Sequence, residues 1–345
     1  MSSNTSPAPA FASVQPKVSV CIATYNRKDY LHQAIASVLK QTFTAFELIV
    51  CDDGSSDGTA EYMESLSDPR VQYIRHEKNI GKSNNMRSGF AAACGDYFIK
   101  FDDDDRLTPD YLARTVAVLE SRPEIDFVST GHWVIDATGR RDLAVTEENA
   151  ECWGRTRLSD GALNHLLQET FVYQSLQIGT TLFRRSVLLE MDYMRADLQN
   201  CEDNDLLVRL ALAGKRAYFL SARLMEYRFH EEQKGFAKGL QYLSDKIAYL
   251  EFFQFDDAAI EKIRQQRLAE CRMTYGLWLI EDGQVRAGRQ MVWAGRRAAS
   301  GKAIAGLLIS YIPKQVRTWA FSWIRRSRAA AQQLKPFDGL AQGVV

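Results

Sequence analysis

The stretch GDYFIKFDDDDRLTPDYL, residues 95–112, decides the fold, because an apolar run from Tyr97 to Phe101 ends there in four aspartates, Asp102 to Asp105. The run has the length of a buried strand and is too short for a typical helix. Four adjacent carboxylates repel each other unless a cation or solvent screens them. Hard divalent ions prefer such oxygens and commonly bridge them to substrate phosphates. A solvated acidic turn that caps the next helix is the alternative.

Two further apolar runs precede this stretch, and polar residues follow each of them. Val18 to Ala23 leads into Thr24-Tyr-Asn-Arg27, and Phe46 to Cys51 leads into Asp52-Asp53-Gly-Ser55. Segments with helical spacing separate the runs, and this alternation predicts crossover connections and a mainly parallel sheet. Ligands of such sheets bind beyond the carboxyl ends of the strands. We therefore expect the three polar clusters to form one site for a metal ion or a nucleotide.

Individual residues of these clusters have both structural and functional interpretations. Asp52 and Asp57 fit a turn and a helix cap, whereas Asp53 could accept hydrogen bonds from a base or a ribose. Tyr25, in a loop, could stack on a nucleobase for about 1–3 kcal/mol or simply be exposed. Glu202-Asp203 opens a predicted helix, where acidic residues favour the helix dipole, and could also supply a general base. Local spacing leaves each of these alternatives open.

Taken together, the motifs resemble the inverting GT-A glycosyltransferases of the family-two type over roughly residues 17–230. Several ordered motifs at the expected separations make this likeness far more specific than any one of them. The matching segments are VSVCIATYNR (18–27), SVLKQTFTAFELIVCDDGSSDGT (37–59), NIGKS (79–83), GDYFIKFDDDDRLTPDYL (95–112) and EDNDLLVRLALAG (202–214).

The resemblance implies three sets of site residues. The catalytic set is the general base Asp203 with Glu202 beside it. The metal set, for Mn²⁺ or Mg²⁺, is Asp104, which would contact the ion directly, with Asp102 and His230. The nucleotide-sugar set is Ala23, Thr24, Tyr25, Arg27, Asp53, Arg87, Asp102 and Asp103.

Arg87 departs from the family pattern. Many members continue the NIGKS segment with an Ala-Arg-Asn triplet, whereas Asn85, Met86 and Arg87 stand here. The arginine is displaced by one position, which is about 100° around a helix. Its contact with the donor phosphates is therefore open.

The resemblance implies an α/β protein of the GT-A type, a Rossmann-like, mainly parallel sheet flanked by helices and followed by an all-α C-terminal region. Its activity would be metal-dependent, inverting transfer of a sugar from a nucleotide-diphosphate sugar, chiefly a UDP-sugar, to a hydroxyl of a glycan or lipid-linked acceptor in envelope polysaccharide synthesis. A nucleotidyltransferase is one alternative, although it would typically show a Gly-rich phosphate loop after the first strand. A catalytically silent nucleotide-binding or scaffold protein is the other, and it would be expected to lack Asp104 or Asp203.

The net charge of zero conceals a basic C-terminal region. Residues 283–337 contain eleven Lys or Arg and no Asp or Glu. Tryptophans beside arginines, as in Trp323-Ile-Arg-Arg326, suit a helix in a lipid headgroup layer. A helical bundle that packs on the catalytic domain or forms a homodimer is the alternative. The Trp-rich apolar face argues against nucleic acid as the partner.

The remaining expectations concern organisation and compartment. Six cysteines spread singly, with no CxxC pair, favour a reducing compartment. No apolar run near the C-terminus approaches the ~20 residues that span a bilayer. We expect a cytoplasmic protein whose basic region is a candidate for peripheral binding to the membrane. The expected domains are a disordered leader (1–16), a GT-A catalytic domain (17–235), a helical basic region (240–330) and a tail (331–345).

Overall fold

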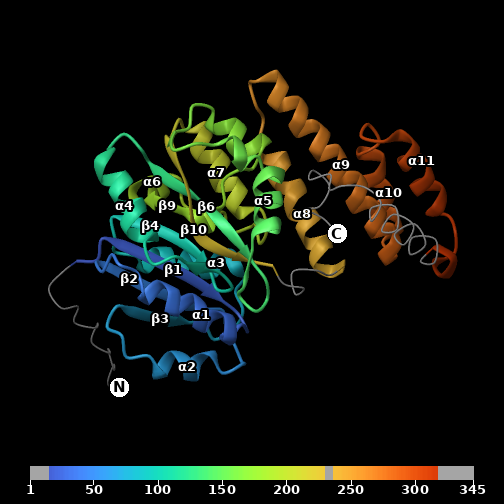
Figure 1. Cartoon of the computed structure of the whole chain (residues 1–345). Coiled ribbons are helices and arrows are strands. Elements are labelled where there is room, and N and C mark those ends of the chain that lie inside the picture. Colours follow the sequence, from blue (N-terminus) through green and yellow to red (C-terminus); the bar gives the residue numbers. More distant parts are fainter. Residues whose placement is uncertain (1–14, 230–235, 318–345) are drawn as a thin grey trace, which may run out of the picture. The chain divides into compact units, whose positions relative to one another are not determined.

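The computed structural model describes residues 15–229 and 236–317 (Figure 1). These residues divide into two compact units. The first unit contains residues 15–197 and 202–229, and the second contains residues 198–201 and 236–317. The predicted His230 lies outside the described residues.

The first unit is built on a mixed sheet, which among the described residues has ten strands. The sheet order is β3-β2-β1-β4-β9-β6-β10-β5, with β7 beside β6 and β8 beside β10. The long neighbours β3, β2, β1 and β4 are parallel, as are β6 and β10, whereas the short strands β5, β7, β8 and β9 pair antiparallel. The predicted mainly parallel α/β sheet is confirmed. The strands are β1 (Val18–Thr24), β2 (Phe46–Asp52), β3 (Val71–Arg75), β4 (Tyr97–Asp102), β5 (Arg106–Leu107), β6 (Phe127–Ile135), β7 (Arg141–Asp142), β8 (Gly161–Ala162), β9 (Thr181–Arg184) and β10 (Ala217–Arg228).

Helices cover both faces of this sheet. One face packs against α1 (Lys28–Leu39), α2 (Thr59–Ser65) and α4 (Tyr111–Ser121). The other packs against α3 (Lys82–Ala92), α6 (Arg185–Glu190) and α7 (Glu202–Leu212). The remaining helical elements of the unit are α5 (Leu143–Cys152), the 3₁₀ turns η1 (Arg155–Arg157) and η3 (Ile178–Thr180), and the π-helical turn η2 (Gln168–Val172).

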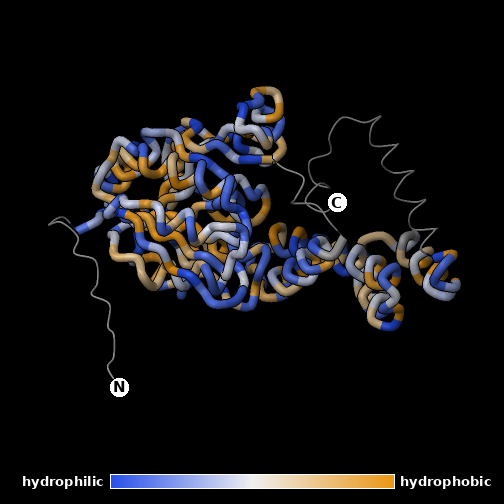
Figure 2. Tube along the Cα trace, turned by 90° about the horizontal axis from the view of Figure 1, so that it is seen from below, coloured by the Kyte–Doolittle hydropathy of each residue, from blue (hydrophilic) through white to orange (hydrophobic). Residues whose placement is uncertain are grey.

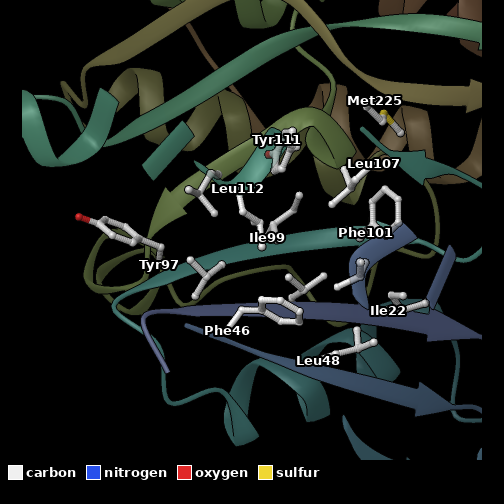
Figure 3. Packing of buried hydrophobic residues seen from close by; sticks show 14 of the residues in the cluster. Ile22, Phe46, Leu48, Tyr97, Ile99, Phe101, Leu107, Tyr111, Leu112 and Met225 are labelled. Atoms are coloured by element: carbon white, nitrogen blue, oxygen red, sulfur yellow. The ribbon is translucent and has the colours of Figure 1, made fainter. Parts of the chain in front are cut away.

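The two-faced core follows from the alternation of side chains along each strand. In β1, the side chains of Val18, Val20 and Ile22 join the cluster on one face, and Cys21 joins the cluster on the other. All four are fully buried, as expected for a parallel strand covered by helices on both sides. Figure 3 shows Ile22 in the first cluster, packed among side chains from β2 and β4.

The long strand β10 is not among the elements expected from the sequence. Its register against β6 shifts between Leu220 and Arg223 and again between Arg223 and Met225. These irregularities interrupt the alternation by which a strand is recognised in a sequence. The short strand β9 follows directly on the 3₁₀ turn η3.

The second unit is helical, and Figure 2 shows hydrophobic residues interspersed with hydrophilic ones along it. The longest helix, α9, begins at the capping residue Asp257, whose side chain accepts from two backbone N–H groups, and ends at Gly283, which has φ 105°. A glycine accepts this left-handed conformation without steric cost. The helices are α8 (Phe236–Phe252), α9 (Ala258–Asp282), α10 (Val285–Ala294) and α11 (Ser300–Ile309).

Gly89 allows α3 to pack closely on β1 and β2. A Cβ at this position would overlap the sulfur atoms of Cys21 and Cys51. We expect Gly89→Ala to lower the free energy of unfolding by about 1–3 kcal/mol, because an overpacked core must shift. Gly301→Ala is a matched control in α11, where no atom lies within 4 Å of the added Cβ. Urea denaturation would measure both, and wild-type stability of Gly89→Ala would contradict this packing.

Candidate active site

The carboxyl ends of β1, β2 and β4 lie side by side. In their parallel register, Thr24 is opposite Asp52, and Ala23 is opposite Asp102. β10 ends at the same edge, since its last residue, Arg228, donates its backbone N–H to Oδ1 of Asp105 over 2.9 Å. The three polar clusters that follow these strands therefore meet at one edge of the sheet.

The loops after β1 and β2 are hydrogen-bonded to each other. The backbone N–H of Asn26 donates to Oγ of Ser55 over 2.9 Å, and Ser56 N–H donates to the Asn26 side-chain oxygen over 2.8 Å. Asn26 has φ 53°, a conformation that asparagine tolerates better than most residues. The adjacent Thr24 is buried, whereas Tyr25 is 47% exposed. The Tyr25 ring is therefore accessible for stacking on a planar ligand.

Asp52 and Asp57 both have structural roles, although Asp57 is not the N-cap of α2, a position that Gly58 takes. One oxygen of Asp52 accepts from Ser55 N–H over 2.8 Å, and the other accepts from the Tyr73 hydroxyl over 2.6 Å. Asp57 accepts from the backbone N–H of Lys28, the first residue of α1, over 2.9 Å. Asp52 therefore holds the turn after β2, as expected, and Asp57 joins that turn to the start of α1.

Asp53 lies buried between that turn and the loop that leads into α3. One of its oxygens accepts from Ile80 N–H over 2.7 Å, and the other accepts from Gly81 N–H over 3.1 Å. Each oxygen retains acceptor capacity beyond these bonds. Asp53 thus fixes the start of α3, and its expected contact with a nucleotide remains a prediction.

The aspartates after β4 form a tight, buried turn held by two arginines. Arg27 donates to Asp104 over 2.9 Å and approaches Asp103 at 3.2 Å. The buried Arg228 donates through Nε to the backbone oxygen of Asp104 over 2.7 Å. Asp105, which is fully buried, accepts from Arg228 N–H. Arg27, predicted to bind the nucleotide sugar, thus contacts the acidic turn itself.

This turn concentrates negative charge. Burial, followed by the neighbouring Asp104 carboxylate, raises the pKa of Asp103 to about 7, although Arg27 opposes the shift. Burial, Asp104 and Asp102 raise the pKa of Asp105 well above its usual range. A bound cation would relieve this repulsion.

Lys100 connects the acidic turn to the predicted base. Its ammonium lies 2.8 and 3.0 Å from the two carboxylate oxygens of Asp102 and 3.5 Å from Oδ2 of Asp203. The side chain of Lys100 is only 1% exposed, so the two aspartates share a buried ammonium. The structure therefore brings together Asp102 and Asp203, which are about a hundred residues apart in the sequence.

These contacts set the charge of the two aspartates. Burial acts to raise the pKa of Asp102, but the ammonium groups of Lys100 and Lys82 outweigh it and lower the pKa to about 2. Burial raises the pKa of Asp203 to about 6, with Lys100 opposing. A carboxylate with this pKa is ionised near neutral pH and is a stronger base than an ordinary aspartate.

Glu202, beside the base, is paired with a second lysine. Its Oε1 lies 2.8 Å from the ammonium of Lys82, the first residue of α3. Glu202 is 2% exposed and Lys82 is 43% exposed. Lys100 and Lys82 are absent from the sequence-based set of site residues. Lys100 could have been inferred from the sequence, because side chains two residues apart in a strand lie on the same face, and Lys100 is two residues before Asp102 in β4.

Arg87 points to a different part of the unit. Its guanidinium donates to the backbone oxygens of Asp192 and Met194 over 2.8 and 2.7 Å and to the Asp192 side chain over 2.9 Å. These bonds tie α3 to the segment before α7. The expected contact between Arg87 and the donor diphosphate remains a prediction that this arrangement does not favour.

Several carboxylate oxygens of the site could serve as ligands to a divalent cation. Oδ2 of Asp105 and Oδ1 of Asp203 are buried without a hydrogen-bond partner among the described residues. Oδ2 of Asp102 and Oδ2 of Asp105 lie 3.9 and 4.0 Å from the position that a Cβ on Gly179 would take. Within the described ranges, no group of three or more His, Cys, Asp or Glu side chains is arranged to hold a metal ion by itself. Ions of the Mg²⁺ type are commonly held by one or two carboxylates together with substrate phosphates, so the residues fit an ion that binds with its substrate.

Two sequence comparisons identify relatives. Residues 19–189 match the family described as Glycosyl transferase family 2. The chain is 30% identical to the putative glycosyltransferase EpsE of Bacillus subtilis over 227 residues, which are 65% of this chain and 76% of that protein. Over 95 residues, 27% of this chain and 31% of the relative, it is 38% identical to the GalNAc(5)-diNAcBac-PP-undecaprenol beta-1,3-glucosyltransferase of Campylobacter jejuni.

The fold is similar to those of two solved structures. Staphylococcus aureus TarS, residues 1–349 in complex with UDP-GlcNAc, superposes with a TM-score of 0.63 at 19% identity and covers 89% of this chain and 92% of that one. The mannosyltransferase PcManGT of Pyrobaculum calidifontis, in complex with GDP-Man and Mn²⁺, superposes with a TM-score of 0.54 at 15% identity over 96% and 91% of the two chains. The chain therefore belongs to glycosyl transferase family 2, with the GT-A fold that its motifs predict, and it is a glycosyltransferase.

Proposed function

We propose that this chain transfers a sugar from a nucleotide-diphosphate sugar, chiefly a UDP-sugar, to an acceptor hydroxyl with inversion at the anomeric carbon. The observation that carries the proposal is the juxtaposition of Asp102 and Asp203 on the buried ammonium of Lys100. It supports an arrangement in which a donor-binding carboxylate and a base face one substrate. The nucleotidyltransferase alternative does not fit the family.

In the proposed mechanism, Asp203 accepts the proton of the acceptor hydroxyl as that oxygen attacks the anomeric carbon. The bond between the anomeric carbon and the diphosphate oxygen breaks, and the nucleoside diphosphate leaves with the electron pair. Attack from the face opposite the leaving group converts an α-linked donor into a β-linked product. Lys100 holds the base in position, and the exposed ring of Tyr25 is suited to stack on the nucleobase.

A divalent cation, Mn²⁺ or Mg²⁺, would bind to Asp104 and Asp102 and neutralise the charge that develops on the leaving diphosphate. The excess of acidic over basic side chains at the site supports the binding of a cation. Six carboxyl groups, at residues 102–105, 202 and 203, share the site with four basic groups, Arg27, Lys82, Lys100 and Arg228. The complex of PcManGT with GDP-Man and Mn²⁺ supports the use of a divalent cation.

A donor screen tests the proposed function. The full chain would be incubated with Mn²⁺ and UDP-, GDP- or dTDP-sugars, and release of the nucleoside diphosphate would be measured with and without a chelator. We expect release from one class of donor, chiefly UDP-sugars, that stops when the metal is chelated. A chain that neither binds nor cleaves any nucleotide sugar would contradict the proposal.

The acceptor is proposed to be a glycan or a lipid-linked glycan of the cell envelope, which the name of the Campylobacter jejuni relative supports. Exposed apolar side chains on the second unit give further support. Trp293 of α10 is 59% exposed, and Ile304 and Leu308, one turn apart on α11, are 60% and 65% exposed. Residues 283–317 carry seven Lys or Arg and no acidic residue. None of the helices that the structure describes is both long and apolar enough to cross a bilayer.

We expect the full chain to bind vesicles that contain anionic phospholipid and not vesicles of neutral phosphatidylcholine alone, because arginines attract the former and apolar side chains enter the headgroup layer. The double substitution Ile304→Glu with Leu308→Glu should reduce flotation with anionic vesicles by about tenfold or more. Leu189→Glu, at an exposed leucine of the first unit, is the control. Equal flotation of all variants would contradict membrane binding through Ile304 and Leu308. No flotation of the wild type would contradict membrane binding altogether and leave packing or dimerisation of the helices.

A further inference from the structure

The basic groups of the site differ in their freedom to meet a ligand. Lys100 is 1% exposed and contacts two carboxylates, and Arg228 is fully buried against backbone oxygens. Arg27 is 27% exposed and pairs with the acidic turn. Lys82, at 43%, is the most exposed of the four and has one ion pair, to Glu202. Its flexible stem can move the ammonium within the site.

Lys82 is also joined to the residue beside the proposed base. Its partner Glu202 immediately precedes Asp203, and Asp203 lies 3.5 Å from Lys100, whose ammonium contacts Asp102. The reacting bond of a donor would lie between the donor-binding carboxylate and the base.

The backbone before Lys82 is fixed, so the direction from which its side chain enters the site is defined. Asp53 accepts hydrogen bonds from the N–H groups of Ile80 and Gly81, immediately before α3. Arg87, five residues further along α3, lies about 140° around the helix from Lys82. Its guanidinium is bound to Asp192 and to the backbone oxygen of Met194. Lys82 therefore lies on the face of α3 that borders the site, whereas Arg87 lies on a different face and contacts the segment before α7.

We propose that Lys82 supplies the cationic contact to the donor diphosphate that the family pattern would assign to an arginine further along α3. This inference rests on the proposed function. On donor binding, the ammonium would exchange Glu202 for a phosphate oxygen and stabilise the charge that the leaving nucleoside diphosphate acquires.

The test compares Lys82→Met with wild type by calorimetric titration of UDP and UMP in the presence of Mn²⁺, with GDP and GMP as the probes if the donor screen selects guanine nucleotides. We expect Lys82→Met to weaken binding of the diphosphate about 10- to 100-fold, because a hydrogen bond to a charged group is lost, and binding of the monophosphate less than about threefold. Lys82→Arg keeps the charge and should restore most of the affinity for the diphosphate. It also keeps the inference testable if Lys82→Met does not fold.

Lys215→Met is the matched control, since it removes another Lys–Glu ion pair, to Glu190, outside the site. It should leave both affinities unchanged. Wild-type affinity of Lys82→Met for the diphosphate, or equal losses for diphosphate and monophosphate, would overturn the inference. So would a loss seen in Arg87→Met and not in Lys82→Met. A wild-type chain that binds no nucleotide would refute the proposed function instead, and the inference with it.

Discussion

Asp203→Asn is expected to reduce sugar transfer by about 10²- to 10⁴-fold. Asparagine has the same shape as aspartate but cannot accept the proton of the acceptor hydroxyl. Asp203 contacts Lys100 only through Oδ2, while Oδ1 has no partner in the described part of the chain and can face an acceptor. Initial rates with the donor found in the screen, together with calorimetric titration of the nucleoside diphosphate, would measure transfer and binding separately.

The nucleotide affinity of Asp203→Asn should stay within about threefold of wild type, because the proposed nucleotide contacts lie on other elements. Asp197→Asn is the control, at a carboxylate that is 65% exposed and paired with Arg195. It should retain full activity. Transfer by Asp203→Asn at the wild-type rate would remove Asp203 as the base.

Asp104→Ala is expected to abolish metal-dependent donor binding, a loss of about 10²-fold or more when the ion supplies several kcal/mol. It removes the carboxylate that we expect to contact the ion, together with the 2.9 Å contact between Asp104 and Arg27. Titration of the nucleoside diphosphate with Mn²⁺, and again with a chelator, would measure the metal-dependent part of the affinity.

The variant with Mn²⁺ should bind as weakly as the wild type with chelator. Asp104→Asn preserves the shape of this buried side chain and is the second variant if alanine destabilises the turn. Glu64→Ala, at an exposed carboxylate of α2, is the control. If Asp104→Ala binds the diphosphate with wild-type affinity and the same response to chelator, Asp104 is not a metal ligand.

Local patterns predicted the first strands of the sheet because each of these strands carries its own signal in the sequence. Val18 to Ala23 and Phe46 to Cys51 are short apolar runs with turn residues after them, and both form parallel strands within a residue of the expected ends. β10 carries no such signal, because its register shifts around Arg223 break the alternation. The strand is long, but its sequence lacks the regular alternation that would predict a strand.

The site could be predicted only in part, because some of its contacts leave no signal in the local sequence. The approach of β1 to β4 follows from the topology of an α/β sheet, which brings Ala23 beside Asp102. Nothing near Asp203 in the sequence indicates that α7 faces that edge, so the resemblance alone linked it to the site. The bridge through Lys100 depends on tertiary packing and appears only in the structure.

The most direct test of the account is to locate the ion itself. Crystals of the full chain grown with Mn²⁺ and a nucleoside diphosphate would be measured near the manganese absorption edge. We predict an anomalous peak within coordination distance of Asp104 or Asp102 and of the diphosphate oxygens. A bound nucleotide with no manganese at these carboxylates, or manganese held elsewhere in the chain, would contradict it.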